Sequence, residues 1–278
     1  MVRFKVVKGS RLLLGLAIAV LVIVLGILMA NYALSDGAAQ TGAEAFNAFA
    51  LLSNAEETED IFGIPQDELL PAEEVKPRVL IYHTHTHEAY RQTEHDPYEA
   101  VEAWRTLDMT HSVVQVGAEL AKELEARGFE VVHDTTDHEK NALGSAYLRS
   151  EETLKQYEGK FDAYIDLHRD AYIKGAGAQT VEADGKQAAR LMMLIGRGDA
   201  FTVKPYYAEN LAFAEELTET LNRIQPNICK EVLVKENRYN QHVGVHAVLL
   251  EVGNNENTLE EACNAMPTFA EALCEVLG

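Results

Sequence analysis

Strand-like and helix-like segments alternate along residues 77–278, and this alternation restricts the possible folds more than any other feature. Val79–Tyr82 is a short apolar run with polar residues after it, which is typical of a buried strand. Ser112–Arg127 has apolar residues at spacings of three and four and precedes Gly128, as expected of an amphipathic helix. This alternation predicts an α/β fold with a central, mostly parallel sheet and helices on both faces.

The same pattern places further elements along the chain. Asp162–Leu167 is predicted as a strand, and a hairpin is predicted from Gln179–Glu182 and Leu191–Ile195 around a turn at Asp184-Gly185. Elsewhere we expect strands at Phe129–Val132, Glu231–Lys235 and Ala247–Glu251, and helices at Leu148–Tyr157, Ala208–Ile224 and Leu259–Leu277.

Three of these strands end in polar side chains with catalytic potential. His83 and His85 follow the first strand, His168 follows the second, and Glu251 ends the third. Ligands of open α/β sheets bind at the carboxyl ends of the strands, so parallel neighbours would bring these groups to one rim. Two histidines and a carboxylate match an open zinc site, whose fourth position holds a water with a pKa lowered to about 7.

Several candidate residues also have alternative roles, and Glu88 could instead cap or solvate a loop. Either His83 or His85 could bind the metal, and the other would then be a core histidine. Glu251 is expected to be functional, because a buried charge is costly unless it is paired or metal-bound. Arg169 either pairs with Asp170 or binds a substrate carboxylate through its planar guanidinium. Four further histidines are expected at the surface: His87, His95, His133 and His138.

The charge of the chain excludes one class of partner. The sequence has 24 Lys and Arg against 44 Asp and Glu, a formal net charge of −20. Nucleic-acid binding needs clustered basic residues to neutralise phosphates, so we expect no nucleic acid as a partner.

The N-terminal residues predict a membrane anchor. Residues 12–30 are uncharged and follow a basic segment, residues 1–11, with Arg3, Lys5, Lys8 and Arg11. A helix of that length spans about 30 Å, the thickness of the hydrocarbon core of a bilayer. We expect a cytoplasmic tail at 1–11, a transmembrane helix at 12–30, an extracytoplasmic tether at 31–76 and the catalytic domain at 77–278, because basic residues stay inside. Cleavage as a signal peptide is the alternative.

Several stretches carry a resemblance to a known family: Tyr82–Thr86 with Glu88 and Tyr90, Arg105–Asp108, Asp166–Ala171, Tyr239–Gln241 and Leu249–Thr258. At these residues the chain resembles the stage II sporulation protein P family, cell-wall hydrolases of endospore-forming bacteria. More widely, it resembles the zinc-dependent N-acetylmuramoyl-L-alanine amidases. The resemblance covers about 77–278, together with the plan of one N-terminal anchor and a tether.

The resemblance implies a set of site residues. Zinc would be held by His85, Glu88 and His168, with Glu251 as the catalytic glutamate and Arg169 as a substrate-binding residue. His85 takes the place of the first histidine when the apolar runs are aligned with the wider amidase motif Asp-Pro-Gly-His, and His83 remains the alternative.

The acidic ligand is the least determined member of the set. In the wider family it precedes the first long helix, and the equivalent place here falls near Thr106, which cannot act as a carboxylate ligand. We therefore expect Glu88 in this role, with Asp108 and Glu94 as lesser candidates.

The implied activity is hydrolysis of the amide between N-acetylmuramic acid and L-alanine in peptidoglycan, with possible endopeptidase activity, during engulfment of the forespore. The implied partners are stage II sporulation proteins D and M. The alternatives are a catalytically inactive wall-binding or scaffolding protein, and a different zinc hydrolase such as a carboxypeptidase or a deacetylase.

Overall fold

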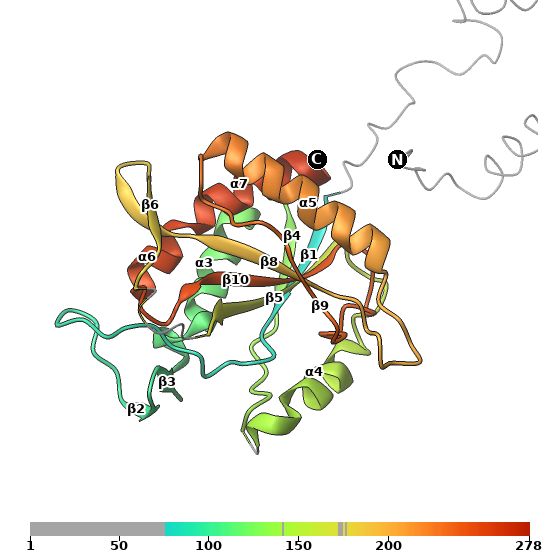
Figure 1. The fold of residues 1–278 in the computed structure, drawn as a ribbon, viewed down its shortest axis with the longest axis horizontal. Helices are drawn as coiled ribbons and strands as arrows, with labels where there is room; N and C mark the ends of the chain where they lie inside the picture. Colours follow the sequence, from blue (N-terminus) through green and yellow to red (C-terminus); the bar gives the residue numbers. More distant parts are fainter. Residues whose placement is uncertain (1–75, 141, 172–174, 176) are drawn as a thin grey trace, which may run out of the picture. The chain divides into compact units, whose positions relative to one another are not determined.

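A six-stranded sheet with the order β4-β1-β5-β10-β8-β9 forms the centre of the computed structural model, which describes residues 76–278 except 141, 172–174 and 176 (Figure 1). Its strands are β1 (Arg78–Tyr82), β4 (Glu130–His133), β5 (Ala163–Asp170), β8 (Leu191–Gly196), β9 (Leu233–Lys235) and β10 (Ala247–Asn254). Neighbouring strands are parallel except for β8 and β10. The prediction of an α/β fold with a mostly parallel central sheet is confirmed.

The helices are α3 (Val113–Ala126), α4 (Ala146–Leu154), α5 (Tyr207–Ile224), α6 (Leu259–Asn264) and α7 (Met266–Leu277), with single 3-10 turns at Met109–His111 and Leu143–Ser145. Helix α3 begins where the Ser112 side chain accepts a hydrogen bond from the Val114 amide, and Thr258 and Glu261 form a reciprocal capping box at α6.

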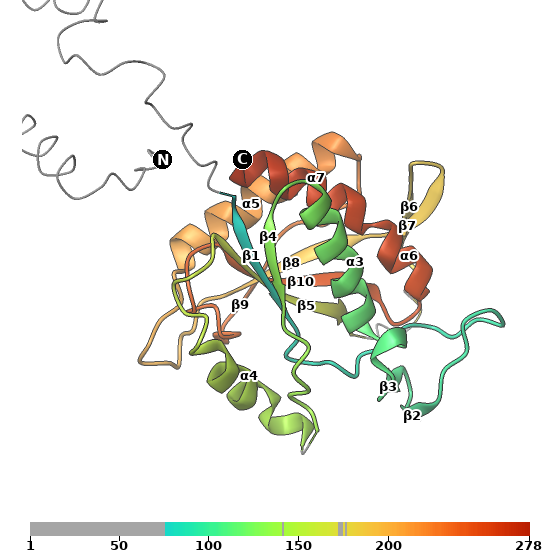
Figure 2. The ribbon, with the colours of Figure 1, turned by 180° about the vertical axis from the view of Figure 1, so that it is seen from behind.

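The two faces of the sheet carry separate hydrophobic clusters. In β1, Val79 and Ile81 belong to the larger cluster, together with buried residues of α3, α5, α6 and α7. Figure 2 shows α3 and α7 lying across the sheet. Leu80 and Tyr82 belong to the smaller cluster on the other face, which includes Leu154 at the end of α4. Helices therefore cover the two faces unevenly, and most of them lie on one.

Three details differ from the sequence-based expectation. The turn at Asp184-Gly185 joins β6 (Thr180–Ala183) to β7 (Lys186–Ala189), because a two-residue turn pairs Ala183 with Lys186 and leaves Leu191–Gly196 for the main sheet. The predicted helix 259–277 is two helices, with Pro267 in the first turn of α7, a position that tolerates proline. A small antiparallel pair, β2 (Ala100–Glu102) and β3 (Arg105–Thr106), has too short a pattern to predict.

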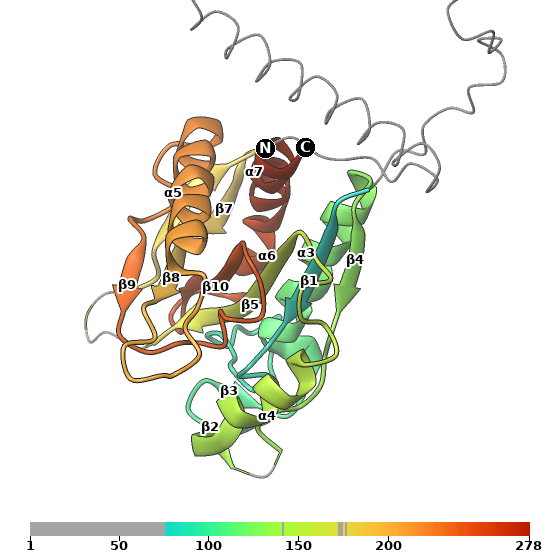
Figure 3. The same cartoon turned by 90° about the vertical axis from the view of Figure 1, so that its right-hand side faces the viewer.

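Helix α4 and the β2–β3 pair lie at the end of the sheet toward which β1 and β5 run (Figure 3). Among the described residues, no helix is long and apolar enough to cross a bilayer. The predicted tail, anchor and tether at residues 1–76 lie outside the described residues except for Lys76.

Candidate active site

The predicted convergence of three strand ends depends on strand order, and the structure has the required order. Strands β1, β5 and β10 are adjacent and parallel. Glu251 lies directly opposite His168 in the β10–β5 register, and Tyr82 lies opposite Asp166 in the β1–β5 register. The segment after β1 therefore begins beside Asp166 and His168, with Glu251 on their other side.

His168 lies between two carboxylates. Its Nδ1 atom is 3.4 Å from Glu88 Oε2, and its Nε2 atom is 2.9 Å from Asp166 Oδ1. The Nε2 contact is an ion-pair distance without hydrogen-bond alignment, so this buried nitrogen lacks a hydrogen bond in the described part of the chain. Burial alone would lower the pKa of His168, but Asp166 and Glu88 raise it well above its ordinary value. This position strongly favours positive charge.

His85 is fixed by a third carboxylate, that of Glu139. The distance from His85 Nδ1 to Glu139 Oε1 is 2.9 Å. The imidazole rings of His85 and His168 are 5.4 Å apart in an edge-to-face arrangement, and the Tyr147 ring packs edge-on against His85 at 5.5 Å. The two histidines predicted as ligands are therefore neighbours.

Glu139 follows β4 in a loop and was not among the predicted site residues. Its Oε1 accepts a hydrogen bond from Arg105 Nη2 at 2.6 Å, and its Oε2 accepts one from the His87 amide at 2.8 Å. Burial alone would raise the pKa of Glu139, but the donors from His85, His87 and Arg105 hold it at about 2. Glu139 is therefore a charged acceptor at neutral pH.

Glu88 comes from the segment after β1. Its Oε2 accepts a hydrogen bond from the Arg169 amide at 3.1 Å, and its side chain is 14% exposed. Burial would raise the pKa of Glu88, but His168, Arg169 and His85 together lower it. Of the three acidic residues considered as ligands, Glu88 is the one beside His168. Asp108 instead caps the turn at Met109–His111, and Glu94 is exposed.

Glu251 has a different environment from the other carboxylates. Its Oε2 atom is buried and has no hydrogen-bond partner among the described residues. Burial raises the pKa of Glu251 to about 8, with further contributions from Glu88 and Asp170 and an opposing effect of His168. A carboxyl group with this pKa can both accept and release a proton near neutrality.

Arg169 contacts the protein backbone with its whole guanidinium group. Its Nε donates to the Ala89 carbonyl at 2.9 Å, Nη2 to the Trp104 carbonyl at 3.1 Å, and Nη1 to the Asp170 carbonyl at 3.3 Å. These bonds tie the segment that carries Glu88 to the end of β5. Arg169 therefore positions the site, and its substrate-binding role stays a prediction.

His83 lies on the other face of the sheet from His168. Its ring is fully buried, with Nδ1 at 2.9 Å from the Leu167 carbonyl and Nε2 at 2.9 Å from His133 Nε2. A Cβ atom on Gly117 of α3 would lie 2.7 Å from both Nε2 atoms, which places this pair directly under the helix. Burial, and secondarily His133, lower the pKa of His83 to about 3. These contacts give His83 the core role.

The surface expectation is wrong for three of the four remaining histidines. His138 is buried, with Nδ1 at 2.8 Å from the His83 carbonyl, and His87 is buried beside Asp137. His133 is half-buried against His83, and His95 is exposed as expected. The loop at 134–139, which folds back onto residues 84–87, explains the burial of His87 and His138.

A loop with unusual backbone angles is connected to the site by hydrogen bonds. Tyr239 and Asn240 both have positive φ angles, of 49° and 53°, which is uncommon for residues other than glycine. The side-chain Nδ2 of Asn240 donates to the Tyr147 carbonyl and to Ser150 Oγ, both at 2.9 Å. Ser150 Oγ is in turn 3.0 Å from Thr84 Oγ1, which donates to Asp166 at 2.7 Å. A buried polar chain thus connects this loop to Asp166, beside His168.

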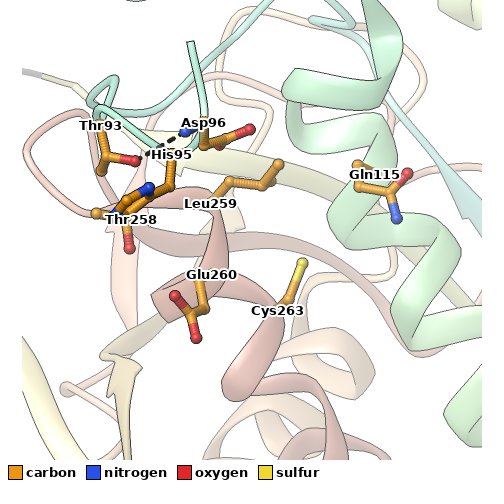
Figure 4. A pocket seen from close by; sticks show the side chains of 8 residues that line it. All are labelled: Thr93, His95, Asp96, Gln115, Thr258, Leu259, Glu260 and Cys263. Atoms are coloured by element: carbon orange, nitrogen blue, oxygen red, sulfur yellow. Dashed lines mark hydrogen bonds between the residues drawn. The ribbon is translucent and has the colours of Figure 1, made fainter.

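A separate hollow of about 370 Å³ lies between α3, α6 and the loop at 93–96 (Figure 4). It is lined by Thr93, His95, Asp96, Gln115, Thr258, Leu259, Glu260 and Cys263. None of the predicted site residues lines it.

The side chains do not form an assembled metal centre. Within the described ranges, no group of three or more His, Cys, Asp or Glu residues has the arrangement needed to hold an ion. Residues of the types that bind zinc nevertheless lie together. The imidazoles of His85 and His168 are neighbours, and the Glu88 carboxylate lies beside His168. On the adjacent strand, the buried Oε2 of Glu251 has no hydrogen-bond partner among the described residues.

Comparison with known proteins identifies the family. The model of the family "Stage II sporulation protein P" matches residues 36–274. The chain belongs to the stage II sporulation protein P family. Stage II sporulation protein P of Bacillus subtilis (strain 168) is 28% identical over 215 residues, which cover 71% of this chain and 50% of the relative. The chain thus spans about half the length of the curated relative it matches.

Solved structures with a similar fold include amidases and the catalytic domain of an endolysin. The catalytic domain of an endolysin targeting Clostridia difficile has a TM-score of 0.45 at 15% identity, covering 72% of this chain and 96% of its own. The CwlD amidase from Clostridioides difficile, in complex with the GerS lipoprotein, has a TM-score of 0.44 at 14% identity, covering 73% and 94%. The catalytic domain of CwlV, an N-acetylmuramoyl-L-alanine amidase from Bacillus (Paenibacillus) polymyxa, has a TM-score of 0.43 at 14% identity, covering 72% and 97%.

In this stage II sporulation protein P family member, sequence reasoning missed two carboxylates of the site. Asp166 could have been found, because it lies two residues before His168 on the same strand and so on the same face. Glu139 had no such signal, because it reaches His85 from a loop whose path follows no periodic pattern.

Proposed function

We propose that the chain is a zinc-dependent peptidoglycan hydrolase that cleaves the amide between N-acetylmuramic acid and L-alanine. One observation carries the proposal: His85, Glu88 and His168 are grouped beside Glu251, whose buried Oε2 atom has no hydrogen-bond partner in the described part of the chain. Membership of the stage II sporulation protein P family supports a role at the cell wall during sporulation.

The residues of the site fit zinc by their chemistry. Zinc prefers imidazole nitrogen and carboxylate oxygen, and a catalytic zinc commonly has two histidines and one carboxylate. His85, Glu88 and His168 supply this set, and the raised pKa of His168 marks a place where positive charge is favoured. When bound, the ion supplies Lewis-acid polarisation of the scissile carbonyl.

The protein's own side chains account for the proton transfers. Glu251 accepts a proton from the attacking water and later gives it to the amine of L-alanine, as a carboxyl group with a pKa near neutrality can. Arg169 holds the segment bearing Glu88 against β5, and Asp166 and Glu139 hold the two histidines.

We further propose that the catalytic domain acts outside the cytoplasmic membrane, held by a single transmembrane helix at residues 12–30. The uncharged run and the basic residues before it support this placement. The family resemblance supports stage II sporulation proteins D and M as partners and allows endopeptidase activity on the peptide stems.

Digestion of purified sacculi with the zinc-loaded protein, followed by mass analysis of the products, tests the activity. The proposal predicts free peptide stems that begin with L-alanine, together with glycan that lacks stems. Products with intact muramoyl–peptide linkages would contradict it, and their masses would identify a carboxypeptidase or a deacetylase instead. A protein that binds sacculi and releases nothing would be a wall-binding scaffold.

A further inference from the structure

We propose that Glu139 is a positioning residue that fixes the imidazole of His85 with its proton on Nδ1, so that Nε2 is the nitrogen left to bind the metal. The inference rests on the proposed function, because it concerns the metal that His85 would share with Glu88 and His168. Glu139 lies in the loop after β4, outside the three strand ends that carry the other residues of the site.

The direction of the hydrogen bond between Glu139 and His85 follows from the other donors at Glu139. Arg105 Nη2 lies 2.6 Å from Oε1, and the His87 amide lies 2.8 Å from Oε2. A guanidinium and a backbone amide can only donate, so both oxygens of Glu139 act as acceptors. His85 Nδ1, at 2.9 Å from Oε1, must therefore be the donor. In a neutral imidazole the other nitrogen, Nε2, then carries the lone pair.

The surroundings keep that lone pair available. The Glu139 side chain is 1% exposed and the His85 side chain 19% exposed, so the contact between them is largely shielded from water. Within the described residues, Nε2 of His85 has no hydrogen-bond partner, and the ring lies 5.4 Å from that of His168. A carboxylate on the second nitrogen of a metal-binding histidine fixes its tautomer and its orientation and makes it a better ligand.

The loop that carries Glu139 is itself held in place. The Glu139 amide donates to Asp137 Oδ1 at 2.9 Å, and Thr86 Oγ1 donates to the same oxygen at 3.1 Å. His87 Nε2 is also 3.1 Å from Asp137 Oδ1. These contacts join the loop at 134–139 to the segment after β1 at Thr86 and His87, on either side of the His85–Glu139 bond.

The second histidine also has a buried carboxylate beside one of its ring nitrogens, at an ion-pair distance without hydrogen-bond alignment. Asp166 Oδ1 lies 2.9 Å from His168 Nε2, and the other ring nitrogen, Nδ1, is the one beside Glu88. Asp166 is 1% exposed and accepts hydrogen bonds from the amide and hydroxyl of Thr84. Each predicted histidine ligand thus has one ring nitrogen at a buried carboxylate, and the other nitrogen of His168 lies beside Glu88, the predicted acidic ligand.

The test uses the full chain with ¹⁵N-labelled histidine, freed of metal with EDTA, at pH 8. Long-range ¹H–¹⁵N spectra show which nitrogen of each ring carries the proton, and His85→Gln identifies the His85 signals. We expect the proton on Nδ1 in the wild type, and a shift of the majority to Nε2 in Glu139→Ala, as in a histidine side chain free in water. Glu139→Gln keeps an acceptor oxygen and should retain the Nδ1 proton.

A competition titration of zinc against a chelator gives a second readout that needs no substrate. The dissociation constant for zinc should be 10–100-fold higher in Glu139→Ala, by analogy with other carboxylates behind histidine ligands, and lower in Glu139→Gln than in the alanine variant. The matched control is Glu130→Ala, an exposed glutamate of β4 that pairs with Arg78, which should bind zinc like the wild type.

A wild-type spectrum with the proton on Nε2 of His85 overturns the inference, and this result needs no variant to fold. Zinc binding by Glu139→Ala within twofold of the wild type also overturns it. If the wild-type chain binds no zinc at all, the proposed function fails, while the spectrum still decides the role of Glu139.

Discussion

Glu251 of β10 and His168 of β5 lie directly opposite each other on adjacent parallel strands. The pairing brings a carboxyl group of high pKa next to an imidazole that favours positive charge. The arrangement requires β10 to pair with β5, which is far from it in the sequence, on one edge while it pairs with β8 on the other.

Replacing Glu251 with Gln should greatly reduce turnover without loss of zinc. A general acid–base group commonly contributes about 10²–10⁴-fold, so we expect a fall of that size in the rate of stem release from sacculi. Zinc content, measured by elemental analysis, should stay that of the wild type, because Glu251 is not a predicted ligand. Glu256→Gln in the following loop is the control, and undiminished turnover in Glu251→Gln would remove Glu251 from the mechanism.

Glu251→Gln should also stabilise the metal-free protein, relative to the wild type, at high pH. Burial raises the pKa of Glu251 from 4.5 to about 8, so between these values the folded chain binds more protons than the unfolded chain. The free energy of unfolding therefore falls as pH rises from about 4.5 to about 8, by roughly 2–5 kcal/mol from this group. Glu251→Gln removes this loss, so its advantage in urea unfolding with EDTA should be near zero at pH 4 and largest above pH 8. An advantage that is equal at both pH values would contradict the buried, protonated carboxyl.

Arg169→Lys separates a positioning role from a substrate-binding role. A lysine cannot reach the carbonyls of Ala89, Trp104 and Asp170 together, so the free energy of unfolding should fall by about 1–3 kcal/mol. Zinc affinity should fall with it, because the segment with Glu88 loses its attachment to β5. Arg91→Lys, which loses one exposed contact to the Glu256 carbonyl, is the control. A rise in KM with unchanged unfolding would instead support the sequence-based prediction that Arg169 binds substrate.

Gly117→Ala should destabilise the protein although alanine favours helices. The substitution ordinarily gains about 1 kcal/mol within a helix. Here the new Cβ would lie 2.7 Å from the Nε2 atoms of His83 and His133, and displacing this buried pair should cost about 1–3 kcal/mol more than the gain. Gly144→Ala, where the new Cβ meets open space, should have almost no effect on urea unfolding. Equal stability of the two variants would show that the histidine pair is not packed against α3.

The sequence predicts the parts of this protein that depend on local pattern. The buried runs of β1, β5 and β10 and the helix at 113–126 follow from apolar periodicity, and parallel packing then brings His85, His168 and Glu251 to one rim. His83 and His168 lie on opposite faces of the sheet, because alternate positions of a strand point to opposite sides. That distinction needed the register between β1 and β5, which no pattern within one strand supplies.

Other features depend on contacts between distant segments and could not be predicted. His87 and His138 are buried because the loop at 134–139 folds back onto the end of β1, and polar residues in a loop carry no signal for burial. The hairpin β6–β7 was misplaced because its second strand, Lys186–Ala189, is polar at its start and has no apolar alternation.

The most direct test of the account is the position of zinc in crystals of the protein. Anomalous difference maps collected above and below the zinc absorption edge should show one peak in contact with the side chains of His85, Glu88 and His168, with the carboxyl group of Glu251 nearby. A zinc-loaded crystal with no peak there, or with its peak bound by His83 or by residues of another part of the molecule, would contradict the account.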